Sequence, residues 1–136
     1  AAGVDGAQMM IEKALSIDPT GAYYHADLGN WAPNKKVDVV HSMEVVYYLY
    51  DPKGFVANVH KNWLKENGRL IVGLDFYKEN TVSHSWPEDC GVSIMQLLPE
   101  ATWIGFFKDA GFSNVQSWRV DVKENWAGTL VITAVK

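Results

Sequence analysis

The chain has 136 residues, of which 48% are hydrophobic and 21% are charged. This is the length of one globular domain and the composition of a folded chain rather than a disordered one. Twelve Lys and Arg against 16 Asp and Glu give a net charge of −4. With no basic cluster and no apolar run of about 20 residues, we expect neither a nucleic-acid nor a membrane partner. The single Cys90 excludes a disulfide framework and a Cys-based zinc site, and it fits a reducing compartment, for which we expect the cytoplasm.

The beginning of the chain predicts a strand, a helix and a second strand. Residues 1–4 are short and apolar and end at an Asp-Gly turn signal. Residues 7–17 predict a helix, because apolar side chains recur at helical spacing at Met10, Ile11, Ala14 and Leu15. Pro19 and Gly21 end this helix, and residues 22–25 predict a short strand.

The middle of the chain predicts a strand followed by a helix. Three β-branched residues indicate a strand over residues 37–43. Asp51-Pro52 predicts a helix start, since an Asp carboxylate can cap a free backbone N–H and Pro at the first position needs no donor. The buried face of this helix is expected at Phe55, Val56, Val59, Trp63 and Leu64. We expect Asn67-Gly68 to end the helix, with Gly68 in the left-handed conformation.

A strand and a long irregular segment come next. Residues 69–74 contain a contiguous apolar run, which is typical of a parallel strand buried on both faces. Residues 76–96 are rich in Asn, Ser, His and Trp and predict a long loop. A loop of this length in a compact domain is often a lid or a binding segment.

The last part of the chain predicts a helix and two strands. The helix begins near Glu100 and has an apolar face at Trp103, Phe106, Phe107 and Ala110. Gly111 ends it. Residues 115–122 and 130–135 predict strands joined by a short turn with no helix between them, so they should form an antiparallel hairpin.

The order of these elements predicts an α/β layer fold with a mostly parallel sheet. In such sheets, ligands bind beyond the carboxyl ends of the strands. The residues at the ends of the predicted strands are therefore the candidates for a site: Asp5, Asp27, residues 42–44 and residues 75–77.

The sequence resembles the class I S-adenosylmethionine (SAM)-dependent methyltransferases of the type 11 small-molecule group. The resemblance extends over essentially the whole chain, and its specificity comes from the order and spacing of short motifs. These are Gly-Val-Asp at 3–5, Met-Ile-Glu-Lys-Ala at 10–14, Ala-Asp-Leu at 26–28, Val-Asp-Val-Val at 37–40, Ser-Met-Glu-Val at 42–45, Asn-Gly-Arg-Leu at 67–70 and Lys-Asp-Ala-Gly-Phe at 108–112. The resemblance implies a three-layer Rossmann-like sheet, mostly parallel, with a C-terminal antiparallel hairpin.

The sequence departs from this family at its start. The family's first strand and Gly-rich loop, which hold the methionine end of the cofactor, should precede Gly3, and no G-x-G-x-G loop occurs in the sequence. We therefore expect residues 1–136 to form a single truncated methyltransferase domain that lacks the first β-α unit. By itself such a fragment should bind the cofactor weakly or not at all and should be inactive.

The resemblance implies cofactor-binding roles for particular residues. Asp5 would accept hydrogen bonds from the ribose hydroxyls, Met10 would pack on the adenine, and Asp27 with the Leu28 backbone would hold the adenine amino group. The methionine half of the cofactor and the acceptor would lie against Ser42, Met43 and Glu44. Tyr47 and Tyr48 come next along the chain. Each of the first three roles has a structural alternative: a helix cap for Asp5, helix core for Met10 and a local turn for Asp27.

A catalytic residue is harder to predict. His84 lies in the long loop with Trp86 and is a weak candidate for a general base, since its reference pKa is near neutrality; a solvated loop histidine is the alternative. His60 lies near the apolar face of the helix predicted after Pro52, so we interpret it as a packing residue.

Three functions therefore stay open. The first is SAM-dependent methyl transfer to a small-molecule acceptor in the intact protein, with the acceptor atom undefined. The second is a noncatalytic Rossmann-like module that forms a homodimer through an exposed strand edge. The third is a nicotinamide-dinucleotide fold, which the terminal hairpin argues against.

Overall fold

The computed structural model describes all 136 residues. The chain divides into two compact units, Ala1–Ala32 and Pro33–Lys136. The order of the main strands and helices is the one that the sequence predicts. None of the helices has the length and hydropathy of a membrane span.

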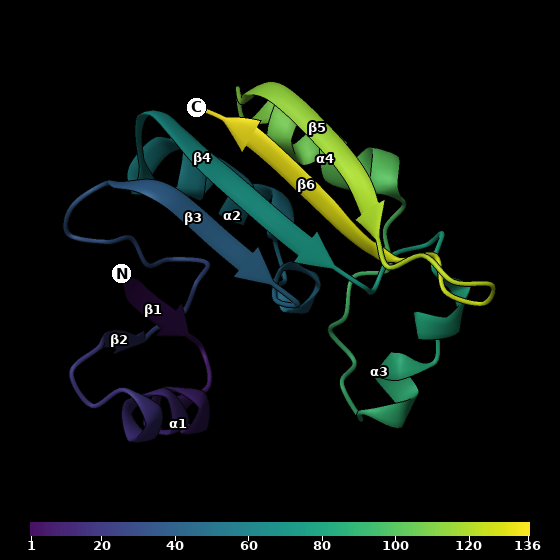
Figure 1. The fold of residues 1–136 in the computed structure, drawn as a ribbon, viewed down its shortest axis with the longest axis horizontal. Helices are drawn as coiled ribbons and strands as arrows, with labels where there is room; N and C mark the ends of the chain where they lie inside the picture. Colours follow the sequence, from purple (N-terminus) through teal and green to yellow (C-terminus); the bar gives the residue numbers. More distant parts are fainter. The chain divides into compact units, whose positions relative to one another are not determined.

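The first unit consists of a helix and a two-stranded sheet. Its elements are β1 (Ala2–Asp5), α1 (Gln8–Ile17) and β2 (Ala22–His25). The two strands run parallel, with Asp5 opposite His25 (Figure 1). Of the apolar face predicted for the helix, only Ile11 is buried, while Met10 is 57% exposed and Leu15 is 40% exposed. The helix-core alternative for Met10 is therefore wrong.

The second unit is built on a four-stranded sheet in the order β3-β4-β6-β5 (Figure 1). Its strands are β3 (Val37–Met43), β4 (Leu64–Leu74), β5 (Ser113–Val120) and β6 (Thr129–Val135). The first two run parallel, whereas β6 runs antiparallel to both β4 and β5. The expected C-terminal hairpin is confirmed.

Six helical segments complete this unit. Two of them, α2 (Pro52–Asn58) and α4 (Glu100–Asp109), lie behind the sheet in Figure 1. The others are short: η1 (Val46–Tyr48), the π-helical η2 (Val59–Trp63), η3 (Thr81–Ser83) and α3 (Trp86–Asp89).

One face of the sheet forms the core of the second unit. Because side chains alternate along a strand, every second residue of the two central strands meets the helices. Six such residues are at most 1% exposed: Leu70, Val72, Leu74, Leu130, Ile132 and Ala134. The other face of the sheet is more open. Four apolar side chains of the outer strands β3 and β5 on that face are between 43% and 54% exposed: Val39, Met43, Trp118 and Val120. The α/β expectation holds, with the helices of this unit on one face of its sheet.

The predicted helix end at Asn67-Gly68 is wrong. The helical segment ends at Trp63, and the strand begins immediately at Leu64. Asn67, not Gly68, adopts the left-handed conformation, with φ of 63°. Asn tolerates that conformation through its short polar side chain. Gly68 is needed for a different reason, since a Cβ there would lie 2.8 Å from the Lys65 carbonyl oxygen.

The segment 76–96 is not an open loop. Its first residues, Phe76 and Tyr77, are at most 1% exposed. The Tyr77 hydroxyl donates to the Gly128 carbonyl at 2.8 Å, and the Gln96 N–H donates to the Tyr47 carbonyl at 2.8 Å. These hydrogen bonds fasten the segment to the hairpin on one side and to η1 on the other.

A testable consequence concerns the start of α2. Asp51 Oδ1 accepts the Gly54 N–H at 2.8 Å, which confirms the predicted cap. Asp51→Ala should lower the free energy of unfolding by about 1 kcal/mol, because it leaves that N–H without its partner. Urea unfolding followed by tryptophan fluorescence measures this. Asp51→Asn is the matched control, since Asn also caps; equal losses in both variants would contradict the prediction.

Candidate functional site

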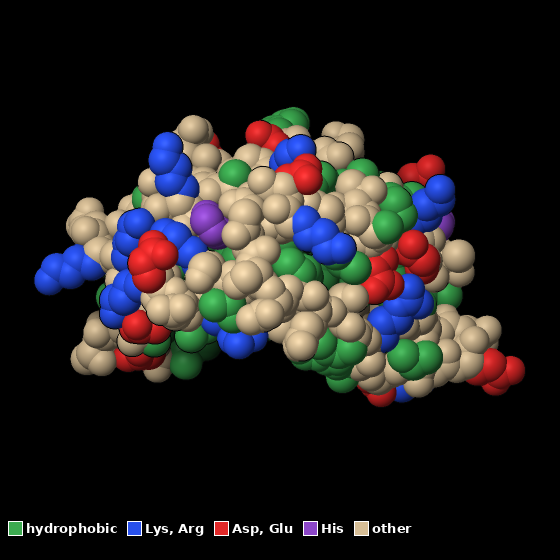
Figure 2. All heavy atoms as spheres, turned by 90° about the horizontal axis from the view of Figure 1, so that it is seen from above, with side chains coloured by type: hydrophobic (Ala, Val, Ile, Leu, Met, Phe, Trp, Pro, Cys, Tyr) green, Lys and Arg blue, Asp and Glu red, His purple; other side chains and the backbone are tan.

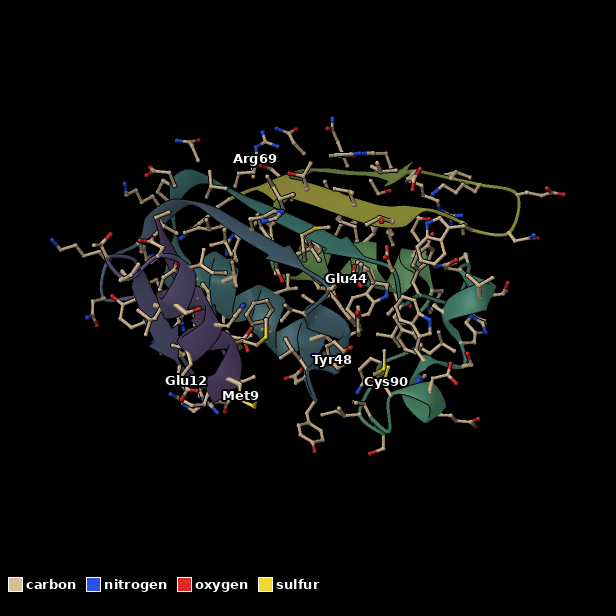
Figure 3. All side chains as sticks on the ribbon, turned by 60° about the horizontal axis from the view of Figure 1, so that its bottom comes forward. Met9, Glu12, Glu44, Tyr48, Arg69 and Cys90 are labelled. Atoms are coloured by element: carbon tan, nitrogen blue, oxygen red, sulfur yellow. The ribbon has the colours of Figure 1, made fainter.

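Two acidic residues follow the neighbouring parallel strands of the second unit. Glu44 comes directly after β3 and Asp75 directly after β4. Because parallel strands end at the same edge of a sheet, both carboxylates belong to one edge. Glu44 donates its backbone N–H to the Gly73 carbonyl at 3.0 Å and has a left-handed φ of 56°, which is uncommon for a residue other than glycine. Figure 3 shows Glu44 where β3 ends.

The carboxylate oxygens at this edge are only partly satisfied. The hydroxyl of the buried Tyr47 donates to Glu44 Oε2 at 2.7 Å. Glu44 Oε1 and Asp75 Oδ1 are both shielded from solvent and have no hydrogen-bond partner. Buried polar atoms in proteins are nearly always hydrogen-bonded, so two such atoms in neighbouring residues need an explanation.

Burial changes the acidity of this edge. It raises the pKa of Glu44 from 4.5 to about 7, and the negative charge of Asp75 adds to the rise, while the hydrogen bonds from the Tyr47 hydroxyl and the Asp75 backbone act against it. Burial and the neighbouring Glu44 carboxylate raise the pKa of the Tyr47 phenol. Tyr47 therefore stays protonated and remains a hydrogen-bond donor to Glu44.

A row of aromatic rings begins beside these carboxylates. The ring centroid of Tyr47 lies 4.5 Å from that of Tyr48 and 5.5 Å from that of Phe76. Phe76 stacks on Trp86 at 6.3 Å, and Trp86 stacks on Trp126 at 6.4 Å. The row thus connects η1, the end of β4, α3 and the loop before β6. Trp86, expected in a lid, is instead one member of this row.

A cavity of about 290 Å³ lies at the far end of the row and is bounded by Asn80, Val122 and Trp126. The Asn80 side chain is fully buried and fully used, since its amide donates to the Asp75 carbonyl at 2.8 Å and its oxygen accepts the Ala127 N–H at 3.2 Å. We therefore place the candidate site at the carboxylates rather than at this cavity.

In the first unit, Asp5 and Asp27 lie at one edge of the small sheet. Asp5 is the last residue of β1, and its carbonyl accepts the Ala26 N–H at 3.0 Å. Asp5 Oδ1 accepts the Ala7 N–H at 2.7 Å, so the local capping role exists and uses one of its two oxygens. Asp27 accepts hydrogen bonds from the Gly29 N–H at 3.0 Å and from Asn30 Nδ2 at 2.7 Å. These bonds form the local turn that was predicted as the structural alternative for Asp27.

The remaining predicted cofactor residues differ in accessibility. Met10 is exposed on α1, and Leu28 is half-buried. Ser42 is half-buried on the helix-covered side of β3, since it pairs with Val72. Met43 lies on the opposite face, where its sulfur occupies the space over Gly73 that a Cβ would fill.

The histidines give no catalytic constellation. His84 is exposed, and its Nε2 lies 3.0 Å from the Lys78 carbonyl oxygen, which fits the solvated loop alternative. His60 packs edge-on against Phe112, with ring centroids 4.7 Å apart, so its predicted packing role is confirmed.

Solved structures show what the chain is similar to. A methyltransferase from Haloferax volcanii, in complex with the Trm112 methyltransferase activator, matches with a TM-score of 0.84 and 25% identity over 98% of this chain and 70% of that one. The N-methyltransferase NodS from Bradyrhizobium japonicum, with S-adenosyl-L-homocysteine bound, matches at 0.74 and 15% over 98% and 64%. A possible histamine N-methyltransferase from Thermotoga maritima matches at 0.76 and 18% over 99% and 72%. No protein-family model and no curated protein matches the sequence.

The chain thus has the class I SAM-dependent methyltransferase fold. It is shorter than these neighbours, and it spans about two thirds of the length of NodS. The sequence predicts Asp75 only as one of the residues 75–77, which follow a predicted strand. Its burial beside Glu44 has no signal in the sequence, because it depends on how η1 and the 76–96 segment pack.

The raised pKa of Glu44 predicts a pH dependence of stability. Below pH 4.5 the carboxyl is protonated in both folded and unfolded chains; as the pH rises toward and through 7, only the unfolded chain ionises without penalty, so stability is lost. Glu44→Gln removes this titration. It should therefore gain stability relative to the unmodified chain between pH 5 and 8, by on the order of 2 kcal/mol.

Urea unfolding of the Glu44→Gln variant and of the unmodified chain, each at pH 5 and at pH 8, measures this difference in the free energy of unfolding. Glu124→Gln, which removes an exposed carboxylate, is the control. A difference between the Glu44→Gln variant and the unmodified chain that is the same at both pH values would contradict the burial argument.

Proposed function

We propose that this chain takes part in SAM-dependent methyl transfer to a small-molecule acceptor. The observation that supports the proposal is the position of acidic residues in a methyltransferase fold. Asp5 ends β1, Asp27 follows β2 and Glu44 follows β3. The carboxyl ends of strands are where α/β sheets bind their ligands.

The residues of the first unit suit the adenosine half of SAM. Asp5 Oδ2 has no protein partner and can accept a ribose hydroxyl, with its charge strengthening the hydrogen bond. Asp27 already accepts two hydrogen bonds, but a carboxylate has further lone pairs with which to accept the adenine amino group. The exposed Met10 thioether can pack on the adenine ring, and Leu28 offers its backbone.

The residues of the second unit suit the methionine half and the acceptor, through Ser42, Met43 and Glu44. Bound SAM supplies an electrophilic methyl group on a sulfonium. The protein's part is to hold the acceptor in line with that methyl group and to exclude water, so that positioning supplies most of the rate enhancement.

We further propose that the cytoplasm is the compartment, since the free thiol of Cys90 is exposed. Basic and acidic side chains are interspersed on the face seen in Figure 2 rather than gathered by sign, which favours a small-molecule acceptor over a nucleic acid. The complex formed by the Haloferax volcanii methyltransferase makes an activator protein a second partner to seek.

The cofactor proposal is tested by titrating the isotope-labelled 136-residue chain with S-adenosylhomocysteine. The sequence contains no Gly-rich loop, so we expect weak binding, on the order of millimolar, with amide NMR shifts at Asp5 and Asp27. Asp5→Asn should reduce those shifts, and Asp18→Asn, at the other end of α1, should not. Absence of any shift would contradict cofactor binding, and micromolar binding would contradict the expectation that a chain without a Gly-rich loop binds the cofactor weakly.

A second candidate function is a noncatalytic module that dimerises through a strand edge. The observation that favours it is that β3 pairs with β4 alone, so its other edge presents unpaired backbone groups. Val39, in the middle of this strand, is 54% exposed. An open strand edge with β-branched residues is a template for pairing with a second copy.

Sedimentation of the chain over a range of concentrations tests the dimer. Pairing through β3 predicts a dimer that Val39→Lys converts to a monomer, because charge on an edge strand disfavours pairing. Val122→Lys places the same charge on another exposed apolar residue and should leave the dimer intact. A strictly monomeric chain at all concentrations would count against this function.

A further inference from the structure

Two buried oxygen atoms at the ends of β3 and β4 lack a hydrogen-bond donor. Glu44 Oε1 and Asp75 Oδ1 are shielded from solvent and have no partner. None of the five salt bridges of the structure involves either residue. The Tyr47 hydroxyl is already used, since it donates to Glu44 Oε2 at 2.7 Å. A carboxyl group that keeps its proton supplies a donor from these residues themselves and removes one of the two buried negative charges.

The segment that carries Glu44 has the features of a hinge. Glu44 itself has a left-handed φ of 56°, and η1 begins two residues later at Val46. A hydrogen bond from the Gln96 N–H to the Tyr47 carbonyl, at 2.8 Å, joins η1 to a distant part of the chain. The side chains of Val46 and Tyr47 are at most 2% exposed. Movement of η1 away from the sheet therefore brings two buried apolar side chains into water.

We propose that Glu44, Tyr47 and Asp75 form a proton-operated latch that holds η1 against the ends of β3 and β4. With one proton between the two carboxyl groups the latch is closed, as in the structure. When that proton passes to solvent, two buried negative charges remain without a cation. The turn at Glu44 then opens, because water can solvate both carboxylates only in the open form.

The acidity of Glu44 gives the pH range in which the latch works. Burial and the charge of Asp75 raise its pKa to about 7, whereas in an open latch it would ionise near the ordinary value, 4.5. The open form therefore gains on the closed form as the pH rises from 4.5 to 7, and the gain levels off above 7. The groups that face Glu44 are Asp75, after β4, and Tyr47, in η1, with Tyr48 acting on Tyr47. Tyr47 stays protonated throughout, because its own pKa is raised.

The latch controls whether water reaches the acidic edge and the first rings of the aromatic row. The rings of Tyr47 and Phe76 lie 5.5 Å apart and are at most 2% exposed in the closed form. Opening exposes these rings together with the end of β3. The proposed function places the methionine half of SAM at that end, so a role of the latch in admitting the cofactor rests on the proposed function, whereas the latch itself does not.

Amide hydrogen exchange of the 136-residue chain, measured by NMR in the absence of cofactor, tests the latch. The reporters are the N–H groups of Tyr48 and Leu49, which form the turn hydrogen bonds of η1, and that of Gln96. After correction for the intrinsic pH dependence of exchange, we expect their protection factors to fall about thirtyfold between pH 5 and pH 7 and about twofold more by pH 8.

A series of low urea concentrations shows whether this opening is local. The amides of Leu130 and Ile132 belong to the buried central strand β6, and their exchange requires the sheet to unfold, so urea should accelerate it. Opening of the latch exposes little surface. The η1 amides should therefore exchange faster than those of β6 at the same pH, at a rate that does not depend on urea.

Three variants separate the carboxyl pair from a general effect of pH. Glu44→Gln removes the titrating group and should keep the η1 amides protected equally at every pH. Asp75→Asn offers an amide donor to ionised Glu44, so the fall in protection should shrink at least several-fold. Asp38→Asn, which removes an exposed carboxylate near the start of β3, should show the full fall. Circular dichroism of each variant confirms that it is folded.

Three results would overturn the latch. They are protection of the η1 amides that does not change with pH in the unmodified chain, an equal fall in Glu44→Gln, or exchange of the η1 and β6 amides at one common urea-dependent rate. The first and third need no variant. Because no cofactor is present, these outcomes leave the proposed methyl transfer untouched, and failure of S-adenosylhomocysteine to bind would leave the latch untouched.

Discussion

The parallel pairing of β3 with β4 is the constraint on which the candidate site depends. It aligns Met43 with Gly73, so Glu44, one residue after Met43, and Asp75, two residues after Gly73, leave the sheet at the same edge. A one-residue change of register would move every side chain of β3 to the opposite face. The register is held by the core, since Val40 pairs with Leu70 on the helix-covered side and both are buried.

The acidic edge combines two features that are each uncommon in proteins. Glu44 adopts a left-handed backbone conformation, as Asn67, Asn114 and Asp121 also do. Two carboxylate oxygens at this edge are buried without partners, and Trp103 Nε1 is the one other such side-chain atom. Other polar groups are satisfied: Glu100 accepts from Ser117 and Arg119, and Asn80 uses both ends of its amide. Local strain and uncompensated polarity that persist in an otherwise consistent structure are typical of functional sites.

The sequence allowed the order of elements, the Asp51 cap and the terminal hairpin to be predicted, because each depends on local signals: periodicity, capping chemistry and loop length. It misplaced the helix end at Asn67-Gly68, because the helical segment ends at Trp63 and the strand begins at Leu64, where neither Gly nor Pro marks the change in the sequence. The candidate site was predicted only as a set of polar residues at strand ends. The burial of Glu44, its bond to Tyr47 and the row of rings that runs from Tyr48 to Trp126 arise from contacts between distant segments, which no local pattern encodes.

The ionisation of Glu44 in the folded chain tests the account most directly. A side-chain carboxyl carbon labelled with ¹³C reports this titration by NMR, without mutation or ligand. The account predicts a titration midpoint of about 7 for Glu44 in the folded, ligand-free chain. The Tyr47 ring signals should shift at the same midpoint, because the Tyr47 hydroxyl donates to the Glu44 carboxylate as it gains charge. A midpoint at the ordinary glutamate value, 4.5, would show that water reaches this carboxylate and would contradict its burial at the end of β3.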